Sequence, residues 1–274
     1  MHNKKRISTI ISVILLGIIA VGFLFPFVWM VATSFKPTNE VFTFTPVGSE
    51  VAWENYPSAL RSIPFGRVVL NSFIVSLAGA ALVVVVSVLS AYAFARLRFK
   101  GRDHLFMVFL GTLVLPQEVL VIPLYIGMQR MGLVNSYFAL IVPFAFGAFG
   151  AFLIRQFLMS LPLEFEEAAR IDGCSDWKIL TKILLPLLKA PITVVGVFAF
   201  IDYWSAFLWP LIVVNDSTLA TIPLGLQMFS GERGTDWGPL MAAVTMTTIP
   251  SILLVVFLQK QLEKGVTLGA FGGR

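Results

Sequence analysis

Six long apolar stretches dominate this chain and constrain its fold more than any other feature. Hydrophobic residues make up 57% of the 274 residues and charged residues only 13%, a composition that excludes an ordinary soluble domain. At about 1.5 Å per residue of helix, each stretch is long enough to cross about 30 Å of hydrocarbon. We therefore expect an all-α, polytopic membrane protein in which residues 1–274 form a single transmembrane domain. The six predicted transmembrane helices cover residues 7–31, 68–95, 105–126, 137–158, 192–214 and 239–258.

The N-terminus shares two features with a secretory signal peptide, basic residues at positions 4–6 and an apolar run after them. The apolar run of residues 7–31 is too long for such a peptide, and no convincing small-residue cleavage site follows it. We therefore expect this run to be retained as the first span.

The basic residues indicate which side of the membrane each loop faces. Of the 20 Lys and Arg residues, 15 fall in the N-terminus, residues 96–102, residues 155–189 and the C-terminal tail. Positively charged loops stay in the cytoplasm, so we predict that both termini and the loop of residues 160–191 are cytoplasmic. The basic residues flank apolar runs and form no basic helix, so the net charge of +5 does not indicate a nucleic-acid partner.

Residues 160–191 form the one long charge-dense segment of the sequence. Three glutamates between positions 164 and 167 place negative charge in the first turn of a short helix that starts near Pro162. Gly173 ends this helix, and Ser175 caps a second one. A helix of about ten residues is marginal in water unless packing supports it, so this helix requires a surface to dock on.

The spacing within this segment resembles the signature loop of ABC importer permeases. In that family the loop reads Glu-Ala-Ala, three residues, Gly, nine residues, Ile, one residue and Leu-Pro, and every spacing holds here. Cys174 and Ile179 are mild departures, because the family commonly has Ala and Phe at these positions. The resemblance implies a type I importer permease fold with a cytoplasmic coupling helix that fits a groove in an ATPase subunit. The implied coupling residues are Glu167, Ala168, Ala169, Gly173, Ile183, Leu185 and Pro186.

The sequence contains no G-x-x-x-x-G-K-[ST] phosphate-binding loop. The resemblance therefore implies that a separate subunit hydrolyses ATP and binds both ATP and Mg²⁺, with no cofactor in this chain. We expect a non-enzymatic subunit of an ATP-driven transporter. Residues Leu268–Gly273 resemble the glycine-containing tail that reaches between the ATPase subunits in maltose-type permeases, and a frayed terminus explains them equally well.

Other segments resemble the carbohydrate class of these permeases, similar to the maltose and glycerol-phosphate systems. They are Asn71-Ser72, residues 115–125 and residues 203–211. The resemblance implies import of a sugar, oligosaccharide or related polyol phosphate across the bacterial cytoplasmic membrane. The implied partners are a second homologous permease, two ATPase subunits, an extracytoplasmic substrate-binding protein and membrane lipid. The external loop of residues 215–237 would contact the binding protein.

Asp202 lies ten positions into the fifth predicted span, near the centre of the bilayer. An ionised Asp there costs about 2.5–3.5 kcal/mol, so it should face a cavity or a polar partner. With Tyr203, Trp204 and Ser205 it forms our predicted translocation path, because aromatic faces and hydroxyl groups suit a polyhydroxylated substrate. A hydrogen bond between helices explains Asp202 equally well. Trp209 falls near a predicted membrane interface, where we expect it to be a belt residue.

Two other classes of protein fit so hydrophobic a sequence. An ion-coupled secondary transporter or channel would use Asp202 and Glu118 as ion or proton sites, and uptake by this chain alone would identify it. A membrane-embedded enzyme is the weaker alternative, because the sequence has no paired catalytic residues. With one cysteine and two histidines, we also expect no metal site.

Overall fold

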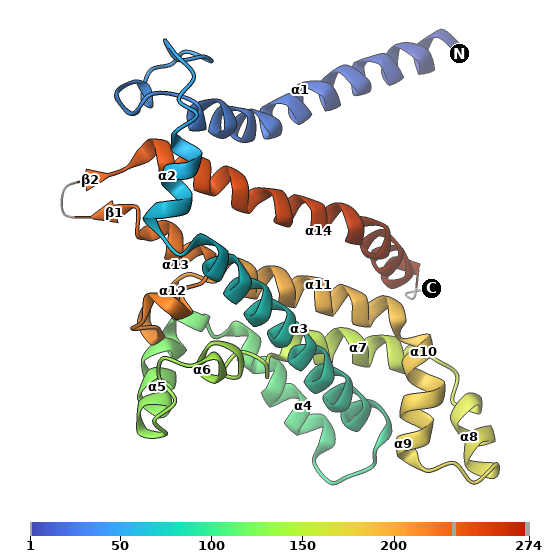
Figure 1. Cartoon of the computed structure of the whole chain (residues 1–274). Coiled ribbons are helices and arrows are strands. Elements are labelled where there is room, and N and C mark those ends of the chain that lie inside the picture. Colours follow the sequence, from blue (N-terminus) through green and yellow to red (C-terminus); the bar gives the residue numbers. More distant parts are fainter. Residues whose placement is uncertain (1, 232–233, 272–274) are drawn as a thin grey trace. The chain divides into compact units, whose positions relative to one another are not determined.

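The computed structural model describes residues 2–231 and 234–271, and these residues are mainly helical (Figure 1). The chain divides into two compact units. Unit 1 comprises residues 1–65 and 225–251, and unit 2 comprises residues 66–224 and 252–274.

Unit 1 holds a short helix against the last helix of the chain through small side chains. Ala59 of the short helix and Ala242 and Ala243 of the last helix are fully buried, and Ile63 and Phe229 complete this core. Small residues of this kind let helices approach closely. The elements are α1 (His2–Ser34), η1 (Thr38–Glu40), α2 (Asn55–Ser62), α13 (Ile222–Gln227, which begins in unit 2), β1 (Ser230–Gly231), β2 (Gly234–Thr235) and α14 (Trp237–Phe271, which begins in unit 1).

The segment between α1 and α2 is an ordered polar loop centred on Lys36. The side chain of Lys36 is buried, its ammonium donates to the carbonyl of Thr43 (2.9 Å), and it lies 4.5 Å from the centre of the Trp29 ring. Asn55 Nδ2 donates to the carbonyls of Ser34 (3.0 Å) and Lys36 (2.9 Å). These bonds satisfy buried backbone groups beyond the end of α1 and so fix the course of the loop.

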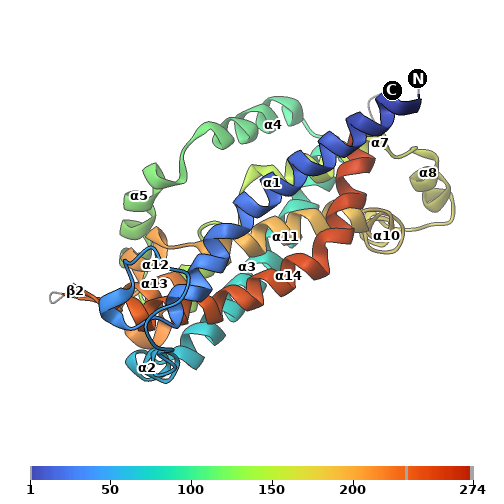
Figure 2. The same ribbon diagram turned by 90° about the horizontal axis from the view of Figure 1, so that it is seen from above.

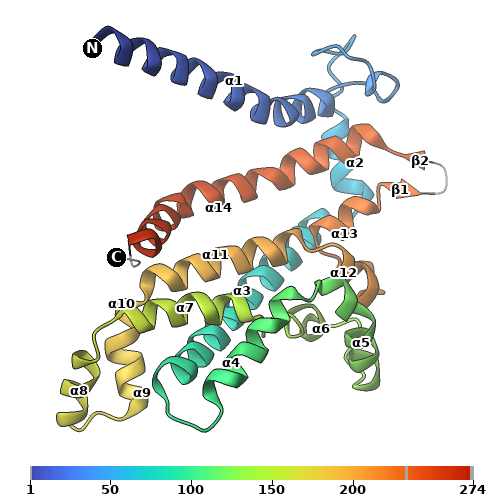
Figure 3. The ribbon, with the colours of Figure 1, turned by 180° about the vertical axis from the view of Figure 1, so that it is seen from behind.

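Unit 2 packs α7 and α11 against the long helix α3, and the three run close together in Figure 3. A Cβ atom added at Gly79 of α3 would come within 2.5 Å of the Tyr203 ring, and one added at Gly150 of α7 within 2.3 Å of Ser87 Oγ. Both positions therefore need glycine for close helix approach. The elements are α3 (Phe65–Arg96), α4 (Arg102–Gly111), η2 (Thr112–Val114), α5 (Gln117–Arg130), α6 (Tyr137–Ile141), α7 (Ala148–Ser160), α8 (Glu164–Ile171), α9 (Asp176–Lys178), η3 (Ile179–Leu184), α10 (Leu185–Leu187), α11 (Lys189–Ser205), α12 (Leu208–Val213) and η4 (Ser217–Leu219).

Among the described residues, two helices are long and apolar enough to cross a membrane unbroken, Ile11–Ser34 within α1 and all of α3. Three further candidates are helix pairs joined at a bend: α4–η2 with α5 (103°), α7 with α8 (78°), and α9–α10 with α11 (81°). The apolar part of α14, Trp237–Leu253, is shorter. The count of six spans therefore stays a prediction.

The structure divides three of the predicted spans into separate helices. The stretches 105–126, 137–158 and 192–214 break at residues 115–116, 142–147 and 206–207. A proline lies in or just after each break, at Pro116, Pro143 and Pro210. Because proline has no N–H, the carbonyl four residues earlier loses its helical hydrogen bond, and the helix ends there.

Candidate functional site

α8 is a short helix that projects beyond the ends of α7 and α11 (Figures 1 and 2). It has eight residues rather than the ten that we expected, because it starts at Glu164 and not near Pro162. Its first turn carries three glutamates, which the positive N-terminal end of the helix dipole stabilises.

The glycine of the motif ends α8 by adopting a left-handed backbone. Gly173 has φ +76°, and its N–H donates to the carbonyl of Arg170 at 3.0 Å. The next N–H, of Cys174, donates to the carbonyl of Ala169 at 2.9 Å. This pair of bonds is a Schellman motif, which requires a residue that tolerates positive φ. The positive φ thus explains why the motif has a glycine at position 173.

The two sides of α8 have different surroundings. Glu166 and Ala169 are buried against the rest of unit 2, whereas Glu167 and Ala168 are exposed. Ile171 is 87% exposed at the end of the same helix. The exposed side of α8 therefore carries both an acidic and a large apolar side chain.

The second helix of the loop starts at the predicted cap and contains an irregular segment. Ser175 Oγ accepts from the Lys178 N–H at 3.5 Å, and α9 then continues through the π-helical segment η3 into α10. π-Helical segments are rare and occur often at functional sites. Beyond α10 the chain bends by 81° into α11, so the loop is joined directly to a membrane helix.

The coupling residues of this second helix divide between the interior and the surface. Ile183 and Leu185 pack against a buried core formed by α3, α7, α8, η3 and α11. Pro186 is exposed, and so is Trp177, at 65%. The motif thus places some members in the core of unit 2 and leaves others accessible to a partner. What these residues do remains a prediction.

An ion pair joins α8 to the end of α3 beneath the exposed motif. Arg96 Nε lies 2.5 Å from Glu166 Oε1, and the two side chains are only 7% and 5% exposed. Arg96 Nη2 also donates to the carbonyls of Leu158 (2.6 Å) and Leu161 (3.2 Å). The sequence indicated only that Arg96 belongs to a basic, cytoplasmic loop. Nothing in the spacing predicts a bond between two residues 70 positions apart.

A buried asparagine is central to the opposite end of unit 2, where the exposed Arg67 Nε also donates to the Thr218 carbonyl at 3.1 Å. Asn71 Nδ2 donates to the carbonyls of Thr218 and Ala220, both at 2.9 Å. The Tyr137 hydroxyl donates to Asn71 Oδ1 at 2.6 Å. One buried amide therefore holds residues 218–220 against α3 and α6 and has both of its own polar atoms satisfied.

Further bonds hold the same segment in place. Ser72 Oγ accepts from the Ile222 N–H at 2.7 Å, and Asn135 Oδ1 accepts from the Asp216 N–H at 3.1 Å. The Asp216 carboxylate accepts from the Thr218 N–H at 2.8 Å, and this bond lowers the pKa of that carboxyl from its usual value. The start of the predicted external loop is therefore a fixed structure.

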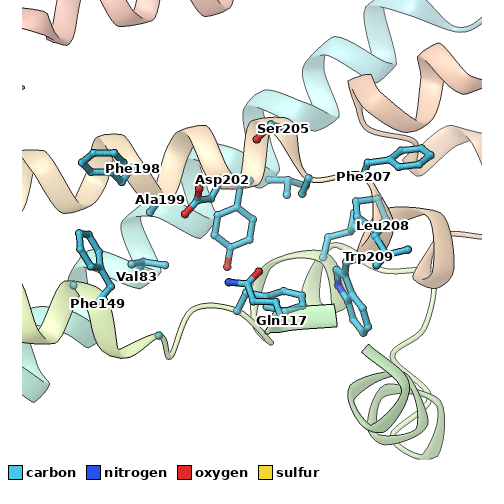
Figure 4. A pocket seen from close by; sticks show the side chains of 18 of the residues that line it. Val83, Gln117, Phe149, Phe198, Ala199, Asp202, Ser205, Phe207, Leu208 and Trp209 are labelled. Atoms are coloured by element: carbon cyan, nitrogen blue, oxygen red, sulfur yellow. The ribbon is translucent and has the colours of Figure 1, made fainter. Parts of the chain in front are cut away.

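A cavity of about 430 Å³ lies within unit 2 where the three broken helices meet (Figure 4). A cavity of this size is usual for a small-molecule site, and non-helical backbone at membrane depth is tolerated where it lines such a space. Its charged lining side chains are Glu118 and Asp202. No group of three or more His, Cys, Asp or Glu residues within 2–231 and 234–271 is arranged to hold a metal ion. Lining residues at the breaks are Leu113, Gln117, Gly147, Ala148, Ala206 and Phe207.

The structure brings three of the four predicted path residues to this cavity. Asp202, Tyr203 and Ser205 line it, and the Asp202 carboxylate points into the open space in Figure 4. Trp204 is not among the lining residues and packs instead against Phe73, with ring centroids 4.8 Å apart. The role of these residues in transport remains a prediction.

Two aromatic side chains replace the helical hydrogen bonds that are lost at the end of α6. Trp209 Nε1 donates to the carbonyl of Ala139 (2.8 Å), and the Tyr203 hydroxyl donates to that of Ile141 (2.5 Å). The Ala139 carbonyl has no helical donor because residue 143 is Pro143. Trp209 is buried, so the expectation of a membrane-interface residue is wrong. Hydropathy alone did not reveal this role of Trp209. The available signal was an aromatic side chain with an N–H donor in a sequence that also contains a proline-interrupted span.

Comparison with known proteins extends this description. Residues 83–268 match the family of the binding-protein-dependent transport system inner membrane component. The sn-glycerol-3-phosphate transport system permease protein UgpE of Pectobacterium atrosepticum is 36% identical, over 97% of this chain and 98% of that protein. The diacetylchitobiose uptake system permease protein DasC of Streptomyces coelicolor is 32% identical, over 93% and 94%. The crystal structure of a bacterial ABC transporter involved in the import of the acidic polysaccharide alginate matches with a TM-score of 0.83 and 24% identity, over 94% of this chain and 97% of that chain.

These matches decide between the classes of protein that the sequence left open. The family and its named permeases support the ABC importer permease over the ion-coupled carrier. The structural likeness confirms the expected fold class, and the family match confirms the resemblance carried by residues 160–191. The chain belongs to the family of binding-protein-dependent transport system inner membrane components, the permease subunits of ABC importers.

Proposed function

We propose that this chain moves a sugar, an oligosaccharide or a related polyol phosphate across the bacterial cytoplasmic membrane, driven by ATP that a separate subunit hydrolyses. The observation that carries the proposal is the two-sided character of α8, with Glu167 and Ile171 exposed and Ala169 buried. Relatives named for diacetylchitobiose, arabinooligosaccharides, lactose and sn-glycerol-3-phosphate support the substrate class.

The exposed side of the coupling loop is suited to a groove in an ATPase subunit. Glu167 is accessible for pairing with a basic residue, and Ala168 allows close approach of the partner backbone. Ile171 and Trp177 supply apolar area that a partner would remove from water. Closure of the ATPase subunits would then push on α8 and switch the membrane helices as rigid bodies.

The complete transporter in this proposal contains a second homologous permease, two ATPase subunits and an extracytoplasmic substrate-binding protein. In support, the structurally similar alginate ABC transporter was crystallised in complex with an alginate pentasaccharide-bound periplasmic protein (TM-score 0.64). The segment of residues 215–237 would contact the binding protein, and both termini would be cytoplasmic, as 15 of the 20 basic residues indicate.

This chain would be a non-catalytic subunit within that assembly. ATP and Mg²⁺ would bind to the ATPase subunits, because this sequence has no phosphate-binding loop. The tail of residues 268–273 would reach between those subunits. α14 extends through Phe271, and residues 272 and 273 lie outside the described residues.

The cavity of unit 2 would form part of the translocation path. Its aromatic walls suit the apolar faces of sugar rings, and Asp202 and Ser205 offer hydrogen-bond acceptors to hydroxyl groups. Tyr203 and Trp204 would hold the path in shape, since Tyr203 bonds to α6 and Trp204 packs on α3.

Uptake by purified transporter in proteoliposomes tests the proposal. This chain would be co-purified with its partner subunits and supplied with the binding protein and four labelled probes, diacetylchitobiose, lactose, an arabino-oligosaccharide and sn-glycerol-3-phosphate. We expect accumulation of at least one probe that requires internal MgATP. Uptake by this chain alone, driven by an ion gradient and indifferent to ATP, would contradict the proposal.

A further inference from the structure

The Arg96–Glu166 pair connects the coupling helix to two membrane helices at once. Arg96 is the last residue of α3, and Glu166 lies on the buried face of α8. The guanidinium of Arg96 also reaches the carbonyls of Leu158 and Leu161, at the end of α7. One side chain therefore bonds α3, α7 and α8 together.

The bonds to α7 strengthen a helix end that proline interrupts, where the Leu158 carbonyl accepts from the Leu161 N–H at 3.1 Å. In a continuing helix the Leu158 carbonyl would accept from the N–H of residue 162, and that residue is Pro162. Arg96 Nη2 adds a second, charged donor to this carbonyl at 2.6 Å. The joint thus depends on an arginine, since a lysine presents no planar set of donors in fixed directions.

The burial of this pair makes the joint stiff. Both side chains are at least nine-tenths buried, and Leu158, whose carbonyl Arg96 bonds, belongs to a buried apolar core together with Ala169 of α8. Separating the charges would leave each one unpaired in an apolar surrounding, which is strongly unfavourable. The other ion pair of α8, between Arg170 and Asp176, is about half exposed, so solvent screens it.

We infer that Arg96 and Glu166 are positioning residues that make α8 move as one body with the inner ends of α3 and α7. The inference rests on the proposed function, in which an ATPase subunit pushes on α8. With the joint intact, displacement of α8 is displacement of the membrane helices. With the joint broken, α8 shifts on its own, and the movement that the ATPase subunit imposes on α8 no longer displaces α3 and α7.

Distance measurements between two spin labels test this inference in the complete transporter. The native cysteine is removed by Cys174→Ser, and labels are placed at Phe165→Cys on α8 and Leu89→Cys on α3, both exposed. Distances are recorded without nucleotide and after trapping with MgATP and vanadate. We expect one narrow distribution with the same mean in both states when the pair is intact.

The variant Glu166→Gln removes the charge and keeps the shape, and Glu164→Gln on the exposed start of α8 is its matched control. Glu166→Gln is expected to broaden the distribution about twofold and to separate the means of the two states, while the ATPase subunits still co-purify. The control is expected to match the unmodified chain. If Glu166→Gln yields no folded complex, Arg96→Lys takes its place and is expected to broaden the distribution less.

Two results would overturn the inference while the ATPase subunits still co-purify. One is a distance that already changes between states with the pair intact, and the other is a substituted pair that leaves the distribution unchanged. Failure of any ATPase subunit to co-purify with the unmodified chain would instead overturn the proposed function, and the inference with it.

Discussion

The two ends of unit 2 are fixed by different chemistry. At the α8 end, a buried ion pair joins α8 to α3. At the opposite end, Asn71, Ser72 and Tyr137 hold residues 218–222 with buried or partly buried uncharged hydrogen bonds. The one charged donor to this segment in the described structure, Arg67 Nε to the Thr218 carbonyl (3.1 Å), is exposed to solvent. A buried charge pair fails all at once, because either lone partner is strongly unfavourable, whereas an amide network loses its bonds one by one. The comparison indicates a stiff joint between helices at the α8 end and, at the other end, a loop segment that hydrogen bonds hold in place.

The largest effect is expected from Arg96→Met, which leaves Glu166 buried and unpaired. Loss of a buried ionic partner costs about 3–5 kcal/mol, equivalent to about two to three and a half orders of magnitude in an opening equilibrium. Cys174 packs beside this joint, so its rate of labelling by a thiol reagent reports the opening. A threefold change in rate corresponds to about 0.6 kcal/mol. A labelling rate within threefold of the unmodified chain would therefore show that the ion pair contributes little to the stability of this end of unit 2.

A smaller and local effect is expected from Asn71→Ala at the opposite end. The substitution removes the Asn71 donor from the Ala220 carbonyl and leaves the Thr218 carbonyl with only the exposed Arg67 Nε at 3.1 Å, at a cost of about 1–3 kcal/mol. Hydrogen exchange at the amides of residues 216–222 should quicken, while Cys174 labelling should not change. Asn215→Ala, in the same loop and exposed, is the control and should alter neither measurement. Faster Cys174 labelling in Asn71→Ala would mean that the two ends are coupled.

Gly173→Ala tests the turn that closes α8. A side chain at φ +76° is strained by about 1 kcal/mol, although nothing lies within 4 Å of the added carbon. We expect Cys174 labelling to rise about fivefold. Gly111→Ala, at the end of α4 with the same open space and ordinary φ, should have no such effect. Equal effects at both glycines would remove the backbone argument.

The smallest effect is expected from Asp176→Asn, which breaks the exposed ion pair of α8 with Arg170. Arg170 and Asp176 are 52% and 50% exposed, and pairs of that kind contribute less than about 1 kcal/mol. Whatever difference appears in the Cys174 labelling rate should shrink at high salt. An effect as large as that of Arg96→Met, retained in salt, would contradict the distinction between the buried and exposed pairs.

The sequence was sufficient for features that depend on local spacing. The glutamates of α8, the left-handed Gly173 and the Ser175 cap all lie within one segment, and the structure places them as a short helix, a turn and a second helix. Apolar runs likewise located the two unbroken candidate spans, Ile11–Ser34 and α3, since hydropathy needs no knowledge of neighbours.

Features that depend on distant partners were not predictable in the same way. Pro26 and Pro250 lie inside the continuous helices α1 and α14, whereas helices break around Pro143 and three residues before Pro210. At the first of these breaks, Trp209 from a distant segment bonds the freed carbonyl of Ala139, and a single sequence does not show such a donor. The Arg96–Glu166 pair was missed for the same reason.

Cross-linking from α8 tests the central claim, that a separate motor acts on this permease through the coupling helix. Ile171→Cys would be introduced with Cys174→Ser, and membranes carrying the whole transporter would be treated with a short bifunctional thiol-and-amine reagent. We predict one main adduct, formed with the ATPase subunit and altered in yield by MgATP and vanadate. Adducts with lipid or with this chain alone, unchanged by nucleotide, would contradict the account.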